Sequence, residues 1–158
     1  MRIVPVDYEH PDAQALVAEV QQEYVTIYGE EDETPVQPAD FRPPRGLFLV
    51  GYLDDRAVAC GGWRAHDDGE DGLQAGDAEL KRMYVVPAAR RRGLARQLLA
   101  ELERTAALAG RKRVVLETGA WQPEAIELYR SSGYHQIAGF GVYRDDPLAR
   151  HFAKELTE

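Results

Sequence analysis

The sequence predicts a single α/β domain, built on a mixed sheet, whose first half is antiparallel and whose centre is a parallel strand–helix–strand crossover. Three observations lead to this expectation. The length of 158 residues allows one ordinary domain, so residues 1–158 are expected to fold together. The composition, 44% hydrophobic and 29% charged, is typical of a globular protein. Strand-like segments precede and follow the clearest helical pattern of the chain.

The first half of the chain is expected to hold one helix and three strands. Apolar residues at helical spacing predict a helix over residues 13–28, which Gly29 ends. The acidic, proline-rich stretch 30–46 predicts a loop or a short irregular helix. The strands are expected at residues 2–6, 47–53 and 57–64, the last two joined as a hairpin by a polar turn.

The second half alternates strands and helices. A strand over residues 79–86 ends at Pro87, and the acidic, glycine-containing stretch before it is expected to be a surface loop. Leu94, Leu98 and Leu102 recur every four residues and predict a helix that ends by Gly110. Beyond it, the pattern predicts a buried strand at 113–117, a helix at 123–132 and a strand at 134–137.

The charge of the chain is divided between its halves. Residues 1–80 carry 18 acidic and 5 basic side chains, a net charge of −13, and residues 81–158 carry 9 acidic and 14 basic ones, a net charge of +5. Together they give the net charge of −8. The arginines cluster at one turn without interleaved aromatic residues, and the isoelectric point is about 5.1, so no nucleic-acid partner is expected.

Processing and membrane signals are not evident. The first ten residues carry charge early and form no apolar signal segment, and no apolar stretch reaches the roughly 20 residues that span a bilayer. The single cysteine, Cys60, cannot form an internal disulfide, and no Cys/His cluster has zinc spacing. We expect a cytoplasmic protein with no membrane contact and no metal.

The segment after Pro87 has the features of an anion-binding site. A strand ends, a turn carries three arginines and Gly93, and a helix begins at once. The unpaired N–H groups of a helix's first turn, together with the positive end of its dipole, attract anions. The chain has neither GxxxxGK[ST] nor GxGxxG, so neither a P-loop nucleotidase nor a dinucleotide-binding fold is supported.

Three blocks around this turn carry a resemblance to a known family. Arg90-x-x-Gly93-x-Ala95 matches the (Gln/Arg)-x-x-Gly-x-(Gly/Ala) signature of the GNAT superfamily of N-acetyltransferases. The MYVVP sequence at 83–87 resembles the strand before that signature, and residues 125–134 resemble the family's second conserved block. The resemblance runs from about residue 79 to residue 134, and more weakly to the end of the chain.

The resemblance implies a GNAT-like fold with acetyl-CoA as cosubstrate. Such a fold has a mixed sheet of about six to seven strands, in which the strands expected at 79–86 and 113–117 are the parallel pair, flanked by helices. The first of them bulges and parts from the second, which opens a V-shaped cleft for the pantetheine arm. Periodicity does not decide whether the tail is helix or strand. The resemblance implies a strand over 149–156 after a loop at 139–147, antiparallel to the strand before it.

The resemblance also implies which residues hold the coenzyme. Backbone N–H groups of the signature loop would bind the pyrophosphate, and backbone groups around residues 83–85 would pair with the pantetheine and polarise the acetyl carbonyl. Gln122 stands where the family often has asparagine. The expected coenzyme-binding residues are Met83, Tyr84, Val85, Arg90, Arg91, Arg92, Gly93, Leu94, Ala95, Arg96, Gln122 and Tyr129.

Three residues are the candidates for proton transfer. Tyr129, in the second conserved block, would be the general acid that protonates the departing thiolate, since a phenol of pKa ~10 suits a thiol of ~8.5. Glu79 is the first candidate for the general base, Glu117 is the second, and a chain of waters is the alternative. Asp77, His66 and His135 are less favoured.

The implied reaction moves an acetyl group from acetyl-CoA directly to a primary amine within a ternary complex. The acceptor is expected to be a small molecule such as an amino acid, a polyamine or an amine antibiotic. The acidic run at 30–33 could attract a cationic amine. Two alternatives remain open, namely a non-catalytic acyl-CoA-binding regulatory module and a protein or peptide N-acetyltransferase. Many members of the family form dimers, and the sequence leaves a homodimer open.

Overall fold

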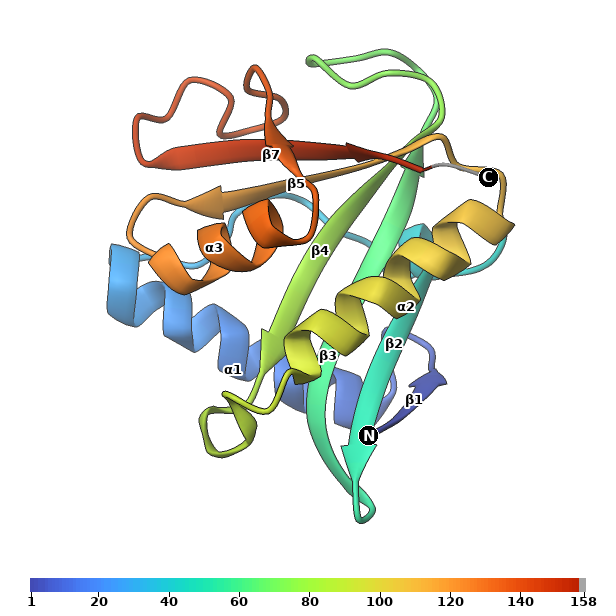
Figure 1. Cartoon of the computed structure of the whole chain (residues 1–158), viewed down its shortest axis with the longest axis vertical. Coiled ribbons are helices and arrows are strands. Elements are labelled where there is room, and N and C mark those ends of the chain that lie inside the picture. Colours follow the sequence, from blue (N-terminus) through green and yellow to red (C-terminus); the bar gives the residue numbers. More distant parts are fainter. Residues whose placement is uncertain (157–158) are drawn as a thin grey trace.

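The computed structural model describes residues 1–156 as a seven-stranded mixed sheet with three α-helices (Figure 1). The order of the strands is β1-β2-β3-β4-β5-β7-β6. Within the described residues, no helix combines the length and apolar character needed to cross a bilayer. In chain order the elements are β1 (Arg2–Pro5), α1 (Pro11–Tyr28), β2 (Gly46–Leu53), β3 (Arg56–His66), β4 (Asp77–Val85), α2 (Leu94–Leu108), β5 (Arg113–Gly119), α3 (Pro123–Ser131), β6 (His135–Gln136) and β7 (Ala149–Glu155).

The predicted topology is confirmed. Strands β1 to β4 pair antiparallel in chain order, and β4 and β5 are parallel. The tail forms β7, which lies antiparallel between β5 and β6, so the strand implied by the resemblance is present. The last two residues of the expected 1–158 domain lie outside the described part.

Element boundaries agree with the prediction to within about two residues. Helix α1 begins at Pro11, which suits a first helical position, and the His10 Nδ1 atom accepts a hydrogen bond of 3.0 Å from the Asp12 N–H group. Strands β3 and β4 extend further than expected because they pair as far as His66 and Asp77. A loop or a short irregular helix was expected for the acidic stretch after α1. The structure has a short 3-10 helix there, Pro38–Phe41.

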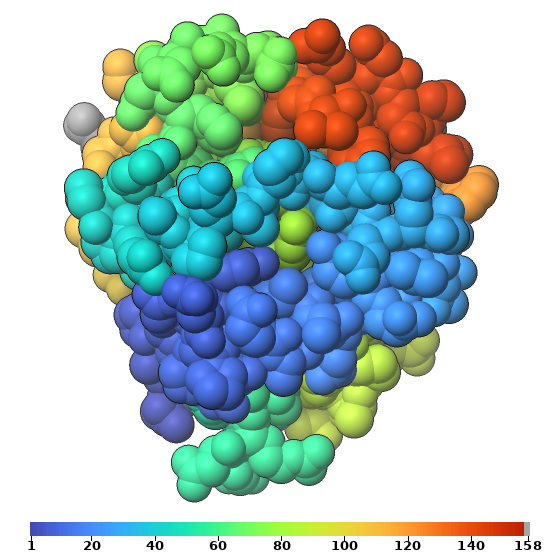
Figure 2. All heavy atoms as spheres, turned by 180° about the vertical axis from the view of Figure 1, so that it is seen from behind, coloured from blue at the N-terminus to red at the C-terminus, as the bar shows by residue number. Residues whose placement is uncertain are grey.

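The helices cover both faces of the sheet. Helices α2 and α3 lie in front of the sheet in Figure 1, and α1 covers the opposite face, which Figure 2 shows from behind. The front core is formed by the leucine stripe of α2, in which Leu98, Leu99 and Leu102 are at most 1% exposed. The back core joins α1 to Phe41 and Phe48. Each face is therefore buried by its own hydrophobic cluster.

Strand β4 stays beside β5 for only a short distance. The register pairs residues 77–79 with residues 113–115, after which the two strands diverge (Figure 1). Further along β4, Arg82 and Met83 together face Gly61 of β3, because the register shifts by one residue there. Arg82 has a φ of 60°, a left-handed conformation that is uncommon for a non-glycine residue and accompanies this β-bulge. The expected bulge and the expected separation of the strands are both present.

A buried ion pair joins β4 and β5 where they still run together. Arg113 donates from Nε to Asp77 Oδ1 at 2.8 Å and from a terminal nitrogen to Asp77 Oδ2 at 2.9 Å. Asp77 is 1% exposed and Arg113 is 8% exposed. Such bidentate pairs are geometrically specific, so this one fixes the strands at the apex of the V.

The first prediction concerns this apex. Asp77→Asn should lower the free energy of unfolding by about 3–5 kcal/mol, because it leaves the Arg113 charge buried without its counter-charge. Urea denaturation would measure the loss. Asp55→Asn is the control, since the Arg2–Asp55 pair is 3.8 Å long with side chains 61% and 98% exposed. If the two substitutions cost the same, the buried pair does not hold the apex.

Candidate active site

A cavity of about 200 Å³ occupies the gap between the diverging strands. Residues 80–83 of β4 and 116–119 of β5 form its sides. Helix α3 contributes Tyr129, while α1 and the loop after it contribute Tyr24, Tyr28 and residues 30–32. On the back of the molecule, the yellow-green of β4 shows through between the blue segments that surround it (Figure 2). The cavity therefore reaches from the α3 side of the sheet to the α1 side.

The bulge in β4 determines which side chains face which side. Leu80 and Met83 pack into the front core with α2 and Tyr129. Lys81 and Arg82, although adjacent in the chain, both bind Asp32 beyond the end of α1. Successive residues of a regular strand point to opposite faces, so the bulge is what places these two cations together.

The turn before α2 has the geometry of an anion site. The first helical bond runs from the Gln97 N–H group to the Gly93 carbonyl, which leaves the N–H groups of residues 94–96 without helical partners. Gly93 has a φ of 75°, and a Cβ atom added there would meet nothing within 4 Å. Arg91 and Arg92 are exposed beside it. The turn is thus open to a phosphate group.

Arg90 in the turn and Arg96 in the first turn of α2 bind protein groups. Arg90 donates to the Val85 carbonyl at 2.9 Å and to Glu23 of α1 at 2.8 Å. Arg96 donates to the hydroxyls of Ser131 and Ser132 at the end of α3. These contacts fix the turn relative to β4, α1 and α3.

Tyr129 lies at the front wall of the cavity and is 8% exposed. Its hydroxyl group is 3.9 Å from the Met83 sulfur atom, to which it donates a weak hydrogen bond. Burial raises the pKa of Tyr129 to about 12. The phenol is therefore protonated at neutral pH and can act as a proton donor.

The Gln122 side chain holds the turn between β5 and α3. Its Oε1 atom accepts hydrogen bonds from the Tyr28 hydroxyl at 3.3 Å and from the Gly119 N–H group at 3.2 Å. A Cβ atom at Gly119 would come within 1.6 Å of the Tyr28 hydroxyl, so a side chain there would force a rearrangement. The cavity wall at this point depends on Gln122 and Gly119 together.

Glu79 does not line the cavity. Its Oε1 atom accepts from Arg64 Nε at 2.9 Å and lies 2.8 Å from His66 Nε2. Burial by itself would raise the pKa of Glu79, but the hydrogen bond from His66 and the charges of Lys81 and Arg64 outweigh it and lower the pKa to about 2. This carboxylate is held by its partners and is a weak base.

Glu117 does line the cavity, and its side chain is 21% exposed. Its cross-strand partner on β7 is His151, whose Nε2 atom is 3.3 Å from Glu117 Oε2. The two atoms lie at ion-pair distance without hydrogen-bond geometry. The remaining base candidates lie elsewhere, since Asp77 pairs with Arg113 and His135 is exposed on β6.

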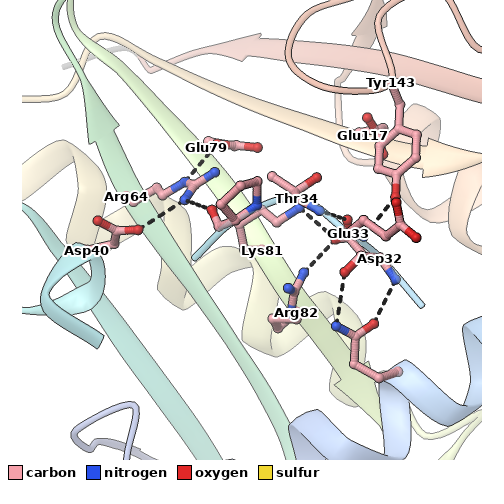
Figure 3. Close-up of polar contacts among 12 residues, drawn as sticks. Asp32, Glu33, Thr34, Asp40, Arg64, Glu79, Lys81, Arg82, Glu117 and Tyr143 are labelled. Carbon is pink, nitrogen blue, oxygen red and sulfur yellow. Dashed lines mark hydrogen bonds and ion pairs between the residues drawn. The ribbon is translucent and has the colours of Figure 1, made fainter. Parts of the chain in front are cut away.

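The acidic run after α1 is not one uniform surface (Figure 3). Asp32 accepts from Lys81 Nζ at 2.8 Å and from an Arg82 terminal nitrogen at 2.5 Å, through the same oxygen. Burial alone would raise the pKa of Asp32, but the charges of Lys81 and Arg82 outweigh it and lower that pKa. Glu30 and Glu31 are exposed at the cavity. Glu33 is exposed, and its N–H group donates to the Tyr143 hydroxyl at 2.8 Å.

Comparison with known proteins identifies the family. The model of the Acetyltransferase (GNAT) family matches residues 13–134. The chain belongs to the GNAT family of acetyltransferases. It is 33% identical to an IAA acetyltransferase of Azospirillum brasilense over 141 residues, which are 89% of this chain and 88% of that protein. It is also 41% identical to the uncharacterized N-acetyltransferase YjgM of Escherichia coli over 96 residues, 61% of this chain and 54% of that protein.

Solved structures support the same GNAT fold. A protein of Klebsiella pneumoniae assigned as an acyl-CoA N-acyltransferase has a TM-score of 0.81 at 28% identity and covers 99% of this chain and 97% of its own. A PaiA N-acetyltransferase of Thermoplasma acidophilum, solved in complex with coenzyme A, has a TM-score of 0.70 at 15% identity. The alignment covers 98% of this chain and 99% of that protein. At 15% identity, the similarity to the PaiA protein shows a shared fold alone. The protein is thus a GNAT-family N-acetyltransferase.

The predicted site residues lie in four places in this GNAT structure. Tyr129, Met83, Gln122 and Glu117 line the cavity, and the signature loop has the geometry of an anion site. Tyr84 points away into the back core, where its hydroxyl donates to Glu19 and burial raises its pKa to about 12. Glu79 lies in a separate ion-pair cluster. Sequence reasoning missed the roles of Asp32, Lys81, Arg82 and His151.

The second prediction concerns the depressed pKa of Glu79. Its ionised form stabilises the fold at neutral pH, and that contribution, at most about 3 kcal/mol, is lost as the pH falls from about 4.5 towards about 2. The stability difference between wild type and Glu79→Gln should therefore be largest at pH 7 and shrink towards pH 3. Urea unfolding across this range measures it, with Glu124→Gln at an exposed site as the control. A difference that is constant with pH would contradict the assignment.

Proposed function

We propose that the protein transfers an acetyl group from acetyl-CoA directly to the primary amine of a small molecule. One observation carries this proposal. Tyr129 of α3 and Glu117 of β5 line the same small cavity, which opens where β4 leaves β5. A proton donor and a proton acceptor thus both border the space where acetyl group and amine would meet.

The coenzyme would occupy the front of the cleft. Its pyrophosphate would bind the N–H groups of residues 91–96 at the start of α2, with Arg91 and Arg92 as flanking charges. Its pantetheine arm would enter the cavity beside residues 83–85 of β4. This edge of β4 carries no pairing to β5, so its backbone groups can pair with the amides of the arm.

The reaction would proceed in one ternary complex. The amine nitrogen attacks the thioester carbon as the ammonium proton passes to Glu117, directly or through a water. The tetrahedral intermediate then collapses, the C–S bond breaks, and the thiolate sulfur takes a proton from Tyr129. The second proton of the new amide nitrogen returns to the Tyr129 oxygen through a water, and Glu117 releases its proton to solvent. Although the Tyr129 pKa of about 12 exceeds that of an exposed thiol, the burial that raises it also raises the pKa of a thiol released beside it.

The position of Cys60 supports direct transfer. Cys60 is fully buried, and its thiol donates to the Arg82 carbonyl at 3.2 Å. Burial raises the pKa of this thiol, so it is a poor nucleophile. An acetylated cysteine is therefore not part of the proposed route.

The cavity dimensions and charge favour a small amine. Glu30, Glu31, Glu117 and Asp146 line the cavity and would attract an ammonium group. An amino acid, a polyamine and an amine antibiotic are the acceptor classes to test. Thiol release with a panel of free amines and of peptides tests the proposal. Acetylation of peptides alone would make the protein a peptide acetyltransferase, and coenzyme binding without any transfer would make it a regulatory module.

The third prediction concerns the general acid. Tyr129→Phe should lower kcat by about 10²- to 10⁴-fold, the usual range for one proton-transfer group, and leave the binding of acetyl-CoA nearly unchanged. Steady-state thiol release and calorimetric titration with acetyl-CoA measure the two effects. Tyr134→Phe is the matched control, because its ring is 5.7 Å from that of Tyr129 and its hydroxyl binds Glu103. Unchanged turnover in Tyr129→Phe would refute the role.

The fourth prediction separates the two carboxylates. Glu117→Gln should reduce kcat by about 10²- to 10⁴-fold at neutral pH, and activity should recover as the pH approaches the pKa of the amine, since a free amine needs no base. The pH–rate profile measures this, and Glu79→Gln should keep the wild-type profile. The reverse pattern would make Glu79 the base, and two unchanged profiles would favour a chain of waters.

A further inference from the structure

Two buried cations face the back of the cavity with one carboxylate between them. The Lys81 and Arg82 side chains are 7% and 3% exposed, and both residues line the cavity. Asp32 accepts from both through its Oδ2 atom. Cations this deeply buried normally have an acceptor for each of their N–H donors. Donors of Lys81 and Arg82 that have no acceptor therefore indicate a place for a ligand.

The donors of this pair exceed the acceptors that the described residues supply. A lysine has three N–H donors and an arginine has five, and one from each goes to Asp32. The Arg82 Nε atom is buried and has no hydrogen-bond partner among the described residues. A buried donor without an acceptor is destabilising, so this pair of cations has too few acceptor oxygens around it.

Neighbouring carboxylates do not remove this excess. Glu79 lies close enough to interact with Lys81, but its Oε1 atom already accepts a hydrogen bond from Arg64 (Figure 3). The same atom lies 2.8 Å from His66 Nε2. Glu30 and Glu31 are exposed, and no ion pair is formed by either within the described residues. The back of the cavity thus contains a positive pair beside an otherwise acidic lining.

We propose that the acceptor carries a carboxylate, which binds Lys81 and Arg82 beside Asp32 while its amine points to Glu117. This inference rests on the proposed acetyl transfer and narrows its substrate to amino acids or similar amine–carboxylate compounds. The second anion would use the spare lysine and arginine donors, and an arginine fork suits a planar carboxylate. β4 presents the cations and β5 presents Glu117, so the opposite walls of the cavity match the two ends of such a molecule. A polyamine would place a second ammonium against this cationic pair.

Matched acceptors test the charge directly. Leucine, methionine and phenylalanine are each compared with the amine that remains after decarboxylation and with the corresponding amide, by thiol release at saturating acetyl-CoA. The free amino acid should have a kcat/KM about 10- to 100-fold higher than its decarboxylated amine, the range expected for charge-assisted hydrogen bonds. The ammonium group of an amino acid amide is more acidic than that of the amino acid, so at a given pH the amide has more free amine. A preference for the amino acid over its amide therefore cannot come from basicity. Equal or better rates with the decarboxylated amines would overturn the proposal.

Substitutions in the pair test the place of binding. Lys81→Met should raise KM for the amino acid about 10- to 100-fold, and this loss should be much larger than any change in kcat/KM for the decarboxylated amine. Arg82→Lys keeps the charge but loses the fork, and should have a smaller effect in the same direction. Arg56→Gln removes an exposed arginine outside the cavity and is the control. Circular dichroism checks folding, and equal losses for both acceptors in Lys81→Met would contradict carboxylate binding here.

A binding measurement distinguishes this proposal from the proposed function. Calorimetric titration of the protein–coenzyme A complex with 4-methylpentanoate, which has the carboxylate but no amine, does not depend on turnover. Binding that weakens at least 10-fold in Lys81→Met would support the carboxylate site even if no amine is acetylated. Acetylation of simple amines without 4-methylpentanoate binding would support the proposed function and refute the carboxylate site.

Discussion

The structure depends on how soon β4 stops pairing with β5. Three residue pairs hold the strands together, and the buried Asp77–Arg113 ion pair fixes them at that end. Beyond it, the edge of β4 has lost its partner strand, and backbone groups inside a protein must find other partners. The pantetheine amides of an acyl-CoA are suitable partners, so the space that the sheet leaves open is where we propose that the coenzyme binds. A longer ladder between the strands would give a more regular sheet and no site.

The bulge in β4 gives that open edge two different sides. It lets Met83 face Tyr129 in front while Lys81 and Arg82 both face Asp32 behind. Without the extra residue, Lys81 and Arg82 would point to opposite faces. The same local irregularity therefore separates the proposed coenzyme side from the acceptor side and supplies the charges of the latter.

Local features of the sequence were sufficient for most helices and strands and for the open turn before α2, whereas the strand at the tail was predicted from the family resemblance. The leucine stripe of α2 and the Arg90–Ala95 signature act over a few neighbouring residues, and a pattern can carry that information. Glu79 and Glu117 show where this fails. The sequence ranked Glu79 first, but Arg64 and His66 reach it from the neighbouring strand β3, and a pattern does not contain that pairing. The His151 side chain comes beside Glu117 through the register of β7, a strand whose periodicity was ambiguous.

The division of charge along the chain becomes a division in space, with one exception. The basic signature turn before α2 suits an anionic coenzyme, while α1 and the loop after it bring Glu30 and Glu31 to the cavity. Lys81 and Arg82 belong to the basic half of the sequence but point to the acidic side. An entirely acidic lining would favour an acceptor with several ammonium groups. The two buried cations would repel an ammonium group at the back of the cavity and attract a carboxylate there. An acceptor with one ammonium group and one carboxylate therefore matches the charges of the site better than an acceptor with positive charge alone.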